Sequence, residues 1–320
     1  MLRSFLIYLS KAPWARRLVT RWKIAWLVAS RFVAGETADD AIRVIRELNA
    51  KGICATLDHL GESVTDAEEA RRATGEIIEI LEEIHRTDVQ SGVSIKPSQI
   101  GLALDPALFE ENLRNILQKA KELNNFVRID MEDTPYTDVT LATFQKLRQE
   151  GFNGQVGIVI QAYLYRSAKD IRQLMETGAP VRLCKGAYKE PADRAFPKKA
   201  DVDANFDVLS EMLISGSLLA GKPLISACGC FPPIPAIASH DEKRIEHAKT
   251  YAQQVGLPKD AIEFQMLNGI RRDLQEQLVA EGYPVRVYVP YGTEWYPYFM
   301  RRLAERPANL WFFISNYFKH

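Results

Sequence analysis

The chain has 320 residues, and 47% of them are apolar, which is enough for a substantial buried core and excludes a disordered protein. Its 41 basic residues balance 41 acidic ones, so no overall positive field attracts nucleic acid, and we expect no nucleic-acid partner. The four cysteines are few for this length and lack the spacing of a metal site, which predicts reduced thiols in a cytoplasmic protein.

The first 35 residues are expected to be helical and to end at Gly35. Seven Lys and Arg residues and no acidic residue lie between Met1 and Ala34, interleaved with large apolar side chains. Two interpretations stay open: an amphipathic helix in peripheral contact with the inner face of a membrane, or a pair of helices capping the bottom of a barrel formed by the rest of the chain. No apolar run reaches the roughly 18 residues that cross a bilayer. We expect residues 1–45 to form a helical segment that packs on a catalytic unit of residues 46–320.

Eight short apolar runs follow, and each stops at a polar or charged residue. Stretches of helical period separate most of them, the alternation typical of βαβ units with parallel strands. Eight such units predict an α/β fold of the (β/α)8 TIM-barrel type, whose active site lies at the carboxyl ends of the strands. The expected strands are 53–57, 93–95, 126–129, 156–160, 181–184, 234–239, 262–264 and 285–287.

The helices expected between these strands carry an apolar stripe along one face. For the sixth strand, residues 224–227 are an alternative to 234–239. We favour residues 234–239 because they place His240 at a strand end. They also place Pro235 near the strand start, where the missing backbone N–H of proline disturbs the sheet least. No dinucleotide-binding glycine motif, metal-ligand spacing or nucleophile elbow occurs in the sequence. The expected helices are 37–49, 65–83, 106–124, 140–149, 168–176, 205–219, 242–255, 271–280 and a last one from about residue 295 through 303.

Charged residues at two neighbouring strand ends and on the last helix are candidates for a site. Lys96 follows the second strand and faces the barrel mouth, where its charge needs an anionic partner, and Asp130 on the next strand is expected to hold it. Such an ion pair fits a structural role as well as the binding of a substrate carboxylate. Arg301 and Arg302 point about 100° apart on a helix, so they either bracket an anion or form a solvated surface pair.

Arg182 lies inside the fifth expected strand and should be largely buried, so it needs a partner that accepts several hydrogen bonds. The structural interpretation is a pairing with Asp130 or Asp58 inside the barrel. Lys185 follows this strand, and Gly186 beside it permits close backbone approach of a phosphate or of a ring edge.

Taken together, eight motifs in this order resemble proline dehydrogenase of the monofunctional bacterial type, over about residues 40–307. They are Asp58-His-Leu-Gly-Glu62-Ser-Val, Ser94-Ile-Lys-Pro-Ser-Gln-Ile-Gly101, Arg128-Ile-Asp-Met-Glu132, Gly157-Ile-Val-Ile-Gln-Ala-Tyr163, Arg182-Leu-Cys-Lys-Gly-Ala-Tyr188, Ser239-His-Asp241, Tyr288-Val-Pro-Tyr-Gly292 and Tyr298-Phe-Met-Arg-Arg-Leu-Ala-Glu305. The resemblance implies a distorted (β/α)8 barrel that binds FAD, oxidises L-proline to Δ1-pyrroline-5-carboxylate and passes electrons to a membrane quinone.

The resemblance also implies a role for individual positions. Lys96, Arg301 and Arg302 would clamp the proline carboxylate, and Glu62 would pair with Arg301 when a lid closes. Asp130 would orient Lys96 and Tyr288, and Arg182 would contact the flavin near N5, so these two are the expected catalytic residues. The pyrrolidine ring would be walled by Tyr188 and Tyr288, with Tyr298 nearby. The FAD would be lined by Met131, Gln161, Lys185, Gly186, Ala187, Ser239 and His240.

Some positions depart from the family pattern. The segment 216–233 is longer than expected, Ser239 replaces a usual Thr, Asp241 a usual Asn, and Asn268 a usual Tyr. These substitutions bear on local contacts with the cofactor and leave the carboxylate clamp untouched.

Two alternatives stay open. One is a related flavin barrel enzyme that acts on hydroxyproline or another cyclic imino acid, with Tyr298 the residue expected to exclude a hydroxyl. The other is a catalytically silent barrel that serves as a binding or scaffold protein.

Overall fold

The computed structural model describes residues 8–10, 12, 14, 15, 19, 23–61 and 64–305. Eight parallel strands close into a barrel in sequence order, with β8 paired back onto β1. This confirms the expected TIM-type α/β fold. The strands are β1 (Cys54–His59), β2 (Ser91–Ile95), β3 (Val127–Ile129), β4 (Val156–Gln161), β5 (Val181–Cys184), β6 (Pro235–Ala238), β7 (Glu263–Leu267) and β8 (Val285–Tyr291).

Each expected strand is found, with small differences at the ends. The sixth strand forms at Pro235–Ala238, the favoured alternative. Strand β8 runs four residues past the expected end at 287 because Tyr288 to Tyr291 continue the ladder with β1.

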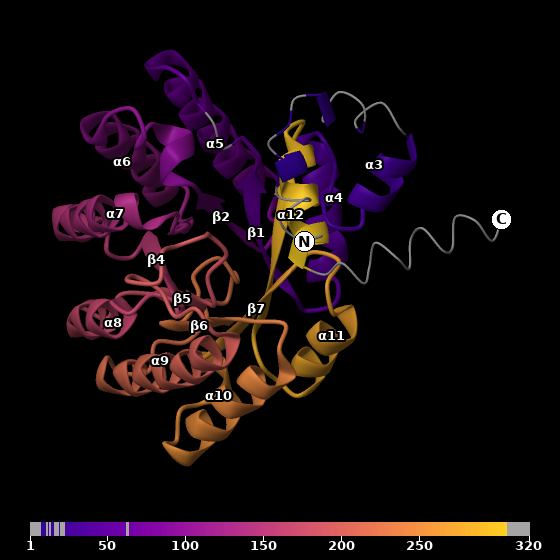
Figure 1. Ribbon diagram of the computed structural model, residues 1–320. Coiled ribbons are helices and arrows are strands. Elements are labelled where there is room, and N and C mark those ends of the chain that lie inside the picture. The colour runs from indigo at the N-terminus through magenta and orange to yellow at the C-terminus, as the bar shows by residue number, and fades with distance from the viewer. Residues whose placement is uncertain are drawn as a thin grey trace.

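Seven helices follow one another around the barrel in sequence order, from α5 to α11 (Figure 1). Two of them begin six residues before the expected start: α7 at Thr134 and α9 at Lys199. Pro135 suits the first turn of α7, where its missing N–H costs nothing. These helices are α5 (Ala67–Thr87), α6 (Pro106–Glu122), α7 (Thr134–Leu147), α8 (Ser167–Glu176), α9 (Lys199–Leu219), α10 (Glu242–Gln254) and α11 (Arg272–Ala280).

The barrel is distorted where it closes. Helix α4 (Ala38–Asn49) packs beside β1 and β8, and Thr37 caps its start by accepting a hydrogen bond from the Asp40 amide. The helix that follows β8, α12 (Trp295–Glu305), packs against α3 (Lys23–Ala29). The outer layer beside β8 is thus formed by α4, which precedes the barrel in the sequence. The helix after β8, α12, packs on the N-terminal segment instead.

The N-terminal segment lies at the carboxyl end of the strands. The Ala34 amide donates to the Pro290 carbonyl at 2.9 Å, and the Gly292 amide donates to the Gly35 carbonyl at 2.9 Å. Apolar residues before Gly35, such as Phe32, share a buried cluster with α12. The interpretation of these residues as caps for the barrel bottom is therefore wrong for the part that the structure describes, because they pack at the opposite end.

Helix α4 runs without a break across residue 45, so the expected boundary between residues 1–45 and 46–320 falls inside a helix. The division into these two units stays a prediction. Within the described ranges, none of the helices combines the length and the apolar character that crossing a bilayer requires.

Candidate active site

A cavity of about 690 Å³ opens at the carboxyl ends of the strands. Thirteen of the sixteen residues expected in the site line it: Lys96, Asp130, Met131, Gln161, Arg182, Lys185, Gly186, Ala187, Tyr188, Ser239, His240, Tyr288 and Arg302. Strand ends supply most of them, as barrel architecture requires. The remaining three are Tyr298, Arg301 and Glu62.

Lys96 forms a buried ion pair with Asp58, on the neighbouring strand β1. Its ammonium nitrogen lies 2.7 Å from both carboxylate oxygens, and the Asp58 side chain is fully buried. Burial raises the pKa of Asp58, while the charge of Lys96 acts to lower it. The expectation that Asp130 holds Lys96 is thus corrected: the carboxylate that grips the ammonium belongs to Asp58.

Asp130 instead connects Tyr288 with Arg182. Tyr288 donates its hydroxyl to Oδ2 of Asp130 at 2.9 Å, and Arg182 Nη1 lies 2.9 Å from Oδ1. The same hydroxyl lies 3.4 Å from the Lys96 ammonium. Burial, followed by the charge of Asp130, raises the pKa of Tyr288 well above its ordinary value, so the phenol stays protonated and donates. This hydrogen bond fixes the direction of the Tyr288 hydroxyl.

The guanidinium of Arg182 is held on several sides. Besides Asp130, it donates from Nε to Oε1 of Gln265 at 2.5 Å and from Nη1 to the Ser94 hydroxyl at 3.2 Å. Its carbon atom Cζ lies 5.4 Å from the centre of the Tyr288 ring, a cation–π contact. Fixed by these contacts, Arg182 presents a positive charge to the cavity in one orientation.

A line of buried polar residues continues from Arg182 toward the barrel floor. Gln265 Nε2 donates to Oε1 of Glu263 at 2.5 Å, and Glu263 forms an ion pair with Arg286 at 3.0 Å. Because Glu263 can only accept, it fixes the Gln265 amide with its oxygen toward Arg182. The sequence offered one weak signal for these residues: three polar side chains inside strands that are otherwise apolar.

Gln161 and Gly186 shape the wall of the cavity around β4 and β5. Gln161 donates from Nε2 to the carbonyls of Met131 and Glu132 at 3.2 and 2.7 Å. Its buried Oε1 atom has no hydrogen-bond partner among the residues that the structure describes. Gly186 has a φ of +102°, and a Cβ atom there would lie 2.2 Å from the Tyr163 ring, so only glycine fits.

Lys185 is neutralised by two carboxylates. Its ammonium lies 2.5 Å from Asp203 on α9 and 2.9 Å from Asp241, the residue before α10. Asp241 is a position where the chain departs from the family pattern, and here the extra charge balances a cation. Burial acts to raise the pKa of both carboxyls. The hydrogen bonds and charge of Lys185, joined at Asp203 by Lys199 and at Asp241 by the Lys243 amide, together outweigh it and leave both pKa values lowered.

Ser239 and His240 form the turn between β6 and α10. The Ser239 hydroxyl accepts from the Asp241 amide at 3.1 Å, and His240 Nε2 accepts from the Leu267 amide at 3.0 Å. Accepting at Nε2 places the proton of the neutral ring on Nδ1. Both side chains therefore have a fixed orientation at the rim of the cavity.

Helix α12 brings one of its two arginines to the cavity. Arg302 lines it, with Cζ 5.0 Å from the centre of the Tyr298 ring. Tyr298 itself is buried in the cluster between α12 and the N-terminal segment. Arg301 is half-buried and outside the set of lining residues. Glu62, its expected partner, lies outside the described residues.

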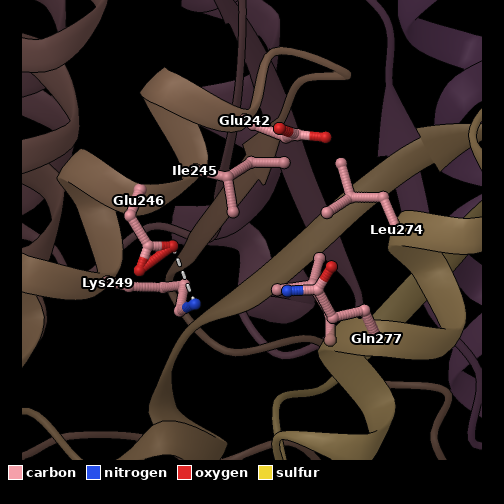
Figure 2. Close-up of a pocket in the computed structure, with 7 residues that line it drawn as sticks. Glu242, Ile245, Glu246, Lys249, Leu274 and Gln277 are labelled. Atoms are coloured by element: carbon pink, nitrogen blue, oxygen red, sulfur yellow. Dashed lines mark hydrogen bonds and ion pairs between the residues drawn. The ribbon is translucent and has the colours of Figure 1, made fainter.

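A smaller hollow of about 220 Å³ lies on the outer helix layer, between α10 and α11 (Figure 2). Lys249 in it is paired with Glu246 at 2.8 Å and with Glu281 at 2.6 Å. The charges there are balanced at the surface, away from the strand ends. The cavity at the barrel mouth is therefore the candidate active site.

The chain is similar to known proteins over most of its length. The sequence profile of the proline dehydrogenase family matches residues 41–314. The chain is 42% identical to proline dehydrogenase 2 of Bacillus subtilis over 310 residues, which are 97% of this chain and 96% of that protein. It is also 42% identical to a proline dehydrogenase of Deinococcus radiodurans over 297 residues, 92% of this chain and 91% of that one.

Solved structures with the same barrel are longer proteins. Proline utilization A (PutA) of Bdellovibrio bacteriovorus, in a form inactivated by N-propargylglycine, superposes with a TM-score of 0.77 at 27% identity. The match covers 87% of this chain and 32% of that one, so the present chain spans about a third of the PutA length. PutA of Corynebacterium freiburgense, at 24% identity and a TM-score of 0.72, shares the fold over 96% of this chain and 33% of its own.

Proposed function

Because the chain belongs to the proline dehydrogenase family, we propose that it oxidises L-proline to Δ1-pyrroline-5-carboxylate with FAD as cofactor and a quinone as electron acceptor. The observation that carries this proposal is the buried set around Arg182, in which Lys96, Asp130 and Tyr288 converge on one cavity.

The residues of the cavity suit a flavin. Its volume of about 690 Å³ is in the range of cofactor sites, roughly 300–1,000 Å³. The buried Oε1 of Gln161 is an acceptor, and the imide N–H of an isoalloxazine ring is a donor that matches it. Met131, Gln161, Lys185 to Ala187, Ser239 and His240 would hold the cofactor. FAD, when bound, supplies the acceptor for the hydride that leaves C5 of proline.

Cationic side chains in the cavity suit a small anion. Lys96, Arg182 and Arg302 all line it, with Lys96 held by Asp58 and Arg182 by Asp130. We propose that Lys96 and Arg302 bind the proline carboxylate, with Arg301 joining them from the same helix and Glu62 pairing with Arg301. An ammonium has three donors, so Lys96 would keep a hydrogen bond to Asp58 and turn another donor to a substrate oxygen.

We propose that the remaining side chains position the pyrrolidine ring of proline and stabilise the charge that develops on the reduced acceptor. Tyr288, fixed by Asp130, would stand against the pyrrolidine ring, and Tyr188, 40% exposed at the mouth, would cover it from outside. Tyr298 would act through Arg302, whose guanidinium lies over its ring. Arg182 would place its charge beside the reacting atoms and favour negative charge on the reduced acceptor.

The N-terminal segment supports a quinone in a membrane as the acceptor. Tyr8, Trp14 and Leu27 are exposed by 61%, 55% and 69%, and the segment before Gly35 carries seven basic residues without an acidic one. Exposed aromatic and apolar groups among basic residues suit the surface of an anionic bilayer. We propose that this segment makes a peripheral contact with the membrane face.

A flavin spectrum under proline titration tests the proposal. The purified protein should be yellow, and L-proline should bleach the flavin bands in the absence of oxygen. N-propargylglycine, which inactivated the PutA of Bdellovibrio bacteriovorus, should inactivate this protein as well, more slowly when L-proline is present. A protein that stays colourless and inactive after incubation with FAD would contradict the proposal.

A further inference from the structure

The segment between α9 and β6 carries two cysteines that proline oxidation does not use. Cys228 and Cys230 flank Gly229 at the amino-terminal end of the barrel, opposite the cavity. The Gly229 carbonyl accepts a hydrogen bond from Nη2 of Arg286, the second residue of β8, at 2.6 Å. Gly229 also packs on the first residue of β1, because a Cβ atom there would lie 2.7 Å from the Cys54 sulfur.

Residues 226–231 form a closed loop that holds both cysteines. The Ser226 amide donates to the Phe231 carbonyl at 3.1 Å, and the Phe231 amide donates to the Ser226 hydroxyl at 3.0 Å. A turn between Ser226 and Gly229 follows, with the Gly229 amide donating to the Ser226 carbonyl at 2.9 Å. Gly229 has a φ of +67°, so the chain reverses between the two cysteines and their side chains are carried on one loop tip.

The two thiols differ in exposure and in contacts. Cys228 is exposed, and its sulfur lies 3.3 Å from the Ser226 hydroxyl. Cys230 is buried, and its sulfur lies 3.5 Å from the Cys228 carbonyl, to which it donates. Burial raises the pKa of the Cys230 thiol to about 12. Burial acts to raise the pKa of the Cys228 thiol too, but hydrogen bonds with Ser226, Cys230 and Phe231 together outweigh it, so this pKa is lowered.

We propose that Cys228 and Cys230 form a reversible dithiol–disulfide site that a hydroperoxide oxidises. An exposed thiolate with a neighbouring thiol is the arrangement typical of redox-sensitive cysteines. The Cys228 thiolate attacks one peroxide oxygen, a sulfur–oxygen bond forms, the oxygen–oxygen bond breaks, and the other oxygen leaves as hydroxide or alkoxide. Cys230 then attacks the Cys228 sulfur, its proton leaves with the oxygen as water, and the disulfide closes. Two electrons pass from the two thiols to the peroxide.

The other two cysteines are poorer targets. Cys184 lies at the carboxyl end of β5, and burial raises the pKa of its thiol to about 11. Cys54 is buried beneath Gly229, donates toward Oε1 of Gln90 at 3.8 Å, and has a pKa raised by burial. Because the thiolate is the reactive form, both should react more slowly than Cys228. Cys54 also serves as the matched control, since it adjoins the same loop.

The experiment treats the full-length, flavin-loaded protein with equimolar hydrogen peroxide and alkylates the remaining thiols before peptide mapping without reductant. We expect loss of two of the four free thiols, both in the peptide that contains Cys228 and Cys230, and a mass lower by two hydrogens. This loss should be at least about tenfold faster than modification of Cys54 or Cys184. Dithiothreitol should restore both thiols.

Three variants decide the assignment, and thermal unfolding of each in the reduced state shows that it is folded. Cys54→Ser should oxidise like the wild type, and Cys228→Ser should keep its other three thiols. Cys230→Ser should accumulate a sulfenic acid at Cys228 that dimedone traps. A bridge from Cys228 to Cys54, earlier oxidation of Cys184, or a Cys228 that goes to sulfinic acid while Cys230 stays free would each overturn the proposal.

Discussion

The Lys96 ammonium lies 2.7 Å from both oxygens of the Asp58 carboxylate, and the pair is almost entirely withdrawn from water. Two charges in such a place depend on each other, because removal of one leaves the other buried without the opposite charge that held it. In the proposed enzyme this pair sets where the ammonium sits, and therefore where a substrate carboxylate can bind. Asp58 contributes to binding through Lys96, as a positioning residue.

We expect Asp58→Asn to destabilise the protein by about 3–5 kcal/mol, because the Lys96 charge loses its carboxylate inside the barrel. The pKa of Lys96 should fall, so KM for proline should rise, and more so at higher pH. Urea unfolding and steady-state kinetics measure the two effects. Asp138→Asn is the control, since Asp138 pairs with Arg166 at the surface and is 81% exposed, where such pairs contribute about 0–1 kcal/mol. If Asp58→Asn and Asp138→Asn lose the same free energy of unfolding, the buried pair contributes no more to stability than a surface pair.

Arg302→Ala should chiefly raise KM for proline, by about 2–4 kcal/mol, or roughly 30- to 900-fold, because a charge that binds the carboxylate is lost. The value of kcat should change less. Arg302→Lys keeps the charge but lacks the planar guanidinium, so its KM for proline should lie between those of the wild type and of Arg302→Ala. Arg301→Ala should act in the same direction if its guanidinium joins the clamp. Unchanged KM in both alanine variants would mean that the carboxylate binds elsewhere.

Much of this site could be predicted from the sequence because barrel architecture decides it. Lys96 and Asp130 directly follow apolar runs, and the carboxyl ends of parallel strands meet at one rim, so both residues had to face the same cavity. The same reasoning could not choose the partner of Lys96. Asp58 and Asp130 lie on strands to either side of it, and only the positions of the side chains across the barrel decide that Asp58 grips the ammonium.

Other features carry no local signal. Gln265 and Glu263 lie within a buried strand, where the spacing of residues does not show which side chains meet inside a barrel. Of the two interpretations of the N-terminal segment, the one that placed it at the barrel bottom is wrong, because an apolar and basic helix has the same pattern whichever end of the barrel it covers. Its position is decided by long-range contacts, such as those of Phe32 and Trp295 in one cluster.

Gln265→Leu should lower kcat by about tenfold with little change in KM, because Arg182 loses the acceptor that fixes its Nε atom. The midpoint potential of the bound flavin should also fall, since a less ordered cation favours the reduced form less. Dye-coupled reduction measures the potential, a quantity that loss of stability alone does not move. Gln265→Glu restores an acceptor to Arg182 but adds a charge beside Glu263, so it should recover less than full activity. If the flavin potential in Gln265→Leu equals that of the wild type, Gln265 does not act on the flavin through Arg182.

The lowered pKa values of Asp203 and Asp241 predict how stability depends on pH. A carboxyl whose pKa is lower in the folded chain than in the unfolded chain stabilises the fold at pH above its ordinary value, and this contribution is lost as pH falls through the folded value. The window is therefore the acid range, below about pH 4. Lys185→Met removes the cation that both carboxylates share, so it should cost stability at neutral pH.

The cost of Lys185→Met should shrink as the solution is acidified, because protonated carboxyls no longer need the ammonium. Unfolding free energies of protein freed of flavin, measured in urea at neutral and acid pH, separate this effect from cofactor binding. Lys199→Met is the matched control: Lys199 also pairs with Asp203 but is 75% exposed, so its loss should act in the same direction and be smaller. A cost of Lys185→Met that stays constant or grows in acid would show that the two carboxylates are not what this lysine stabilises.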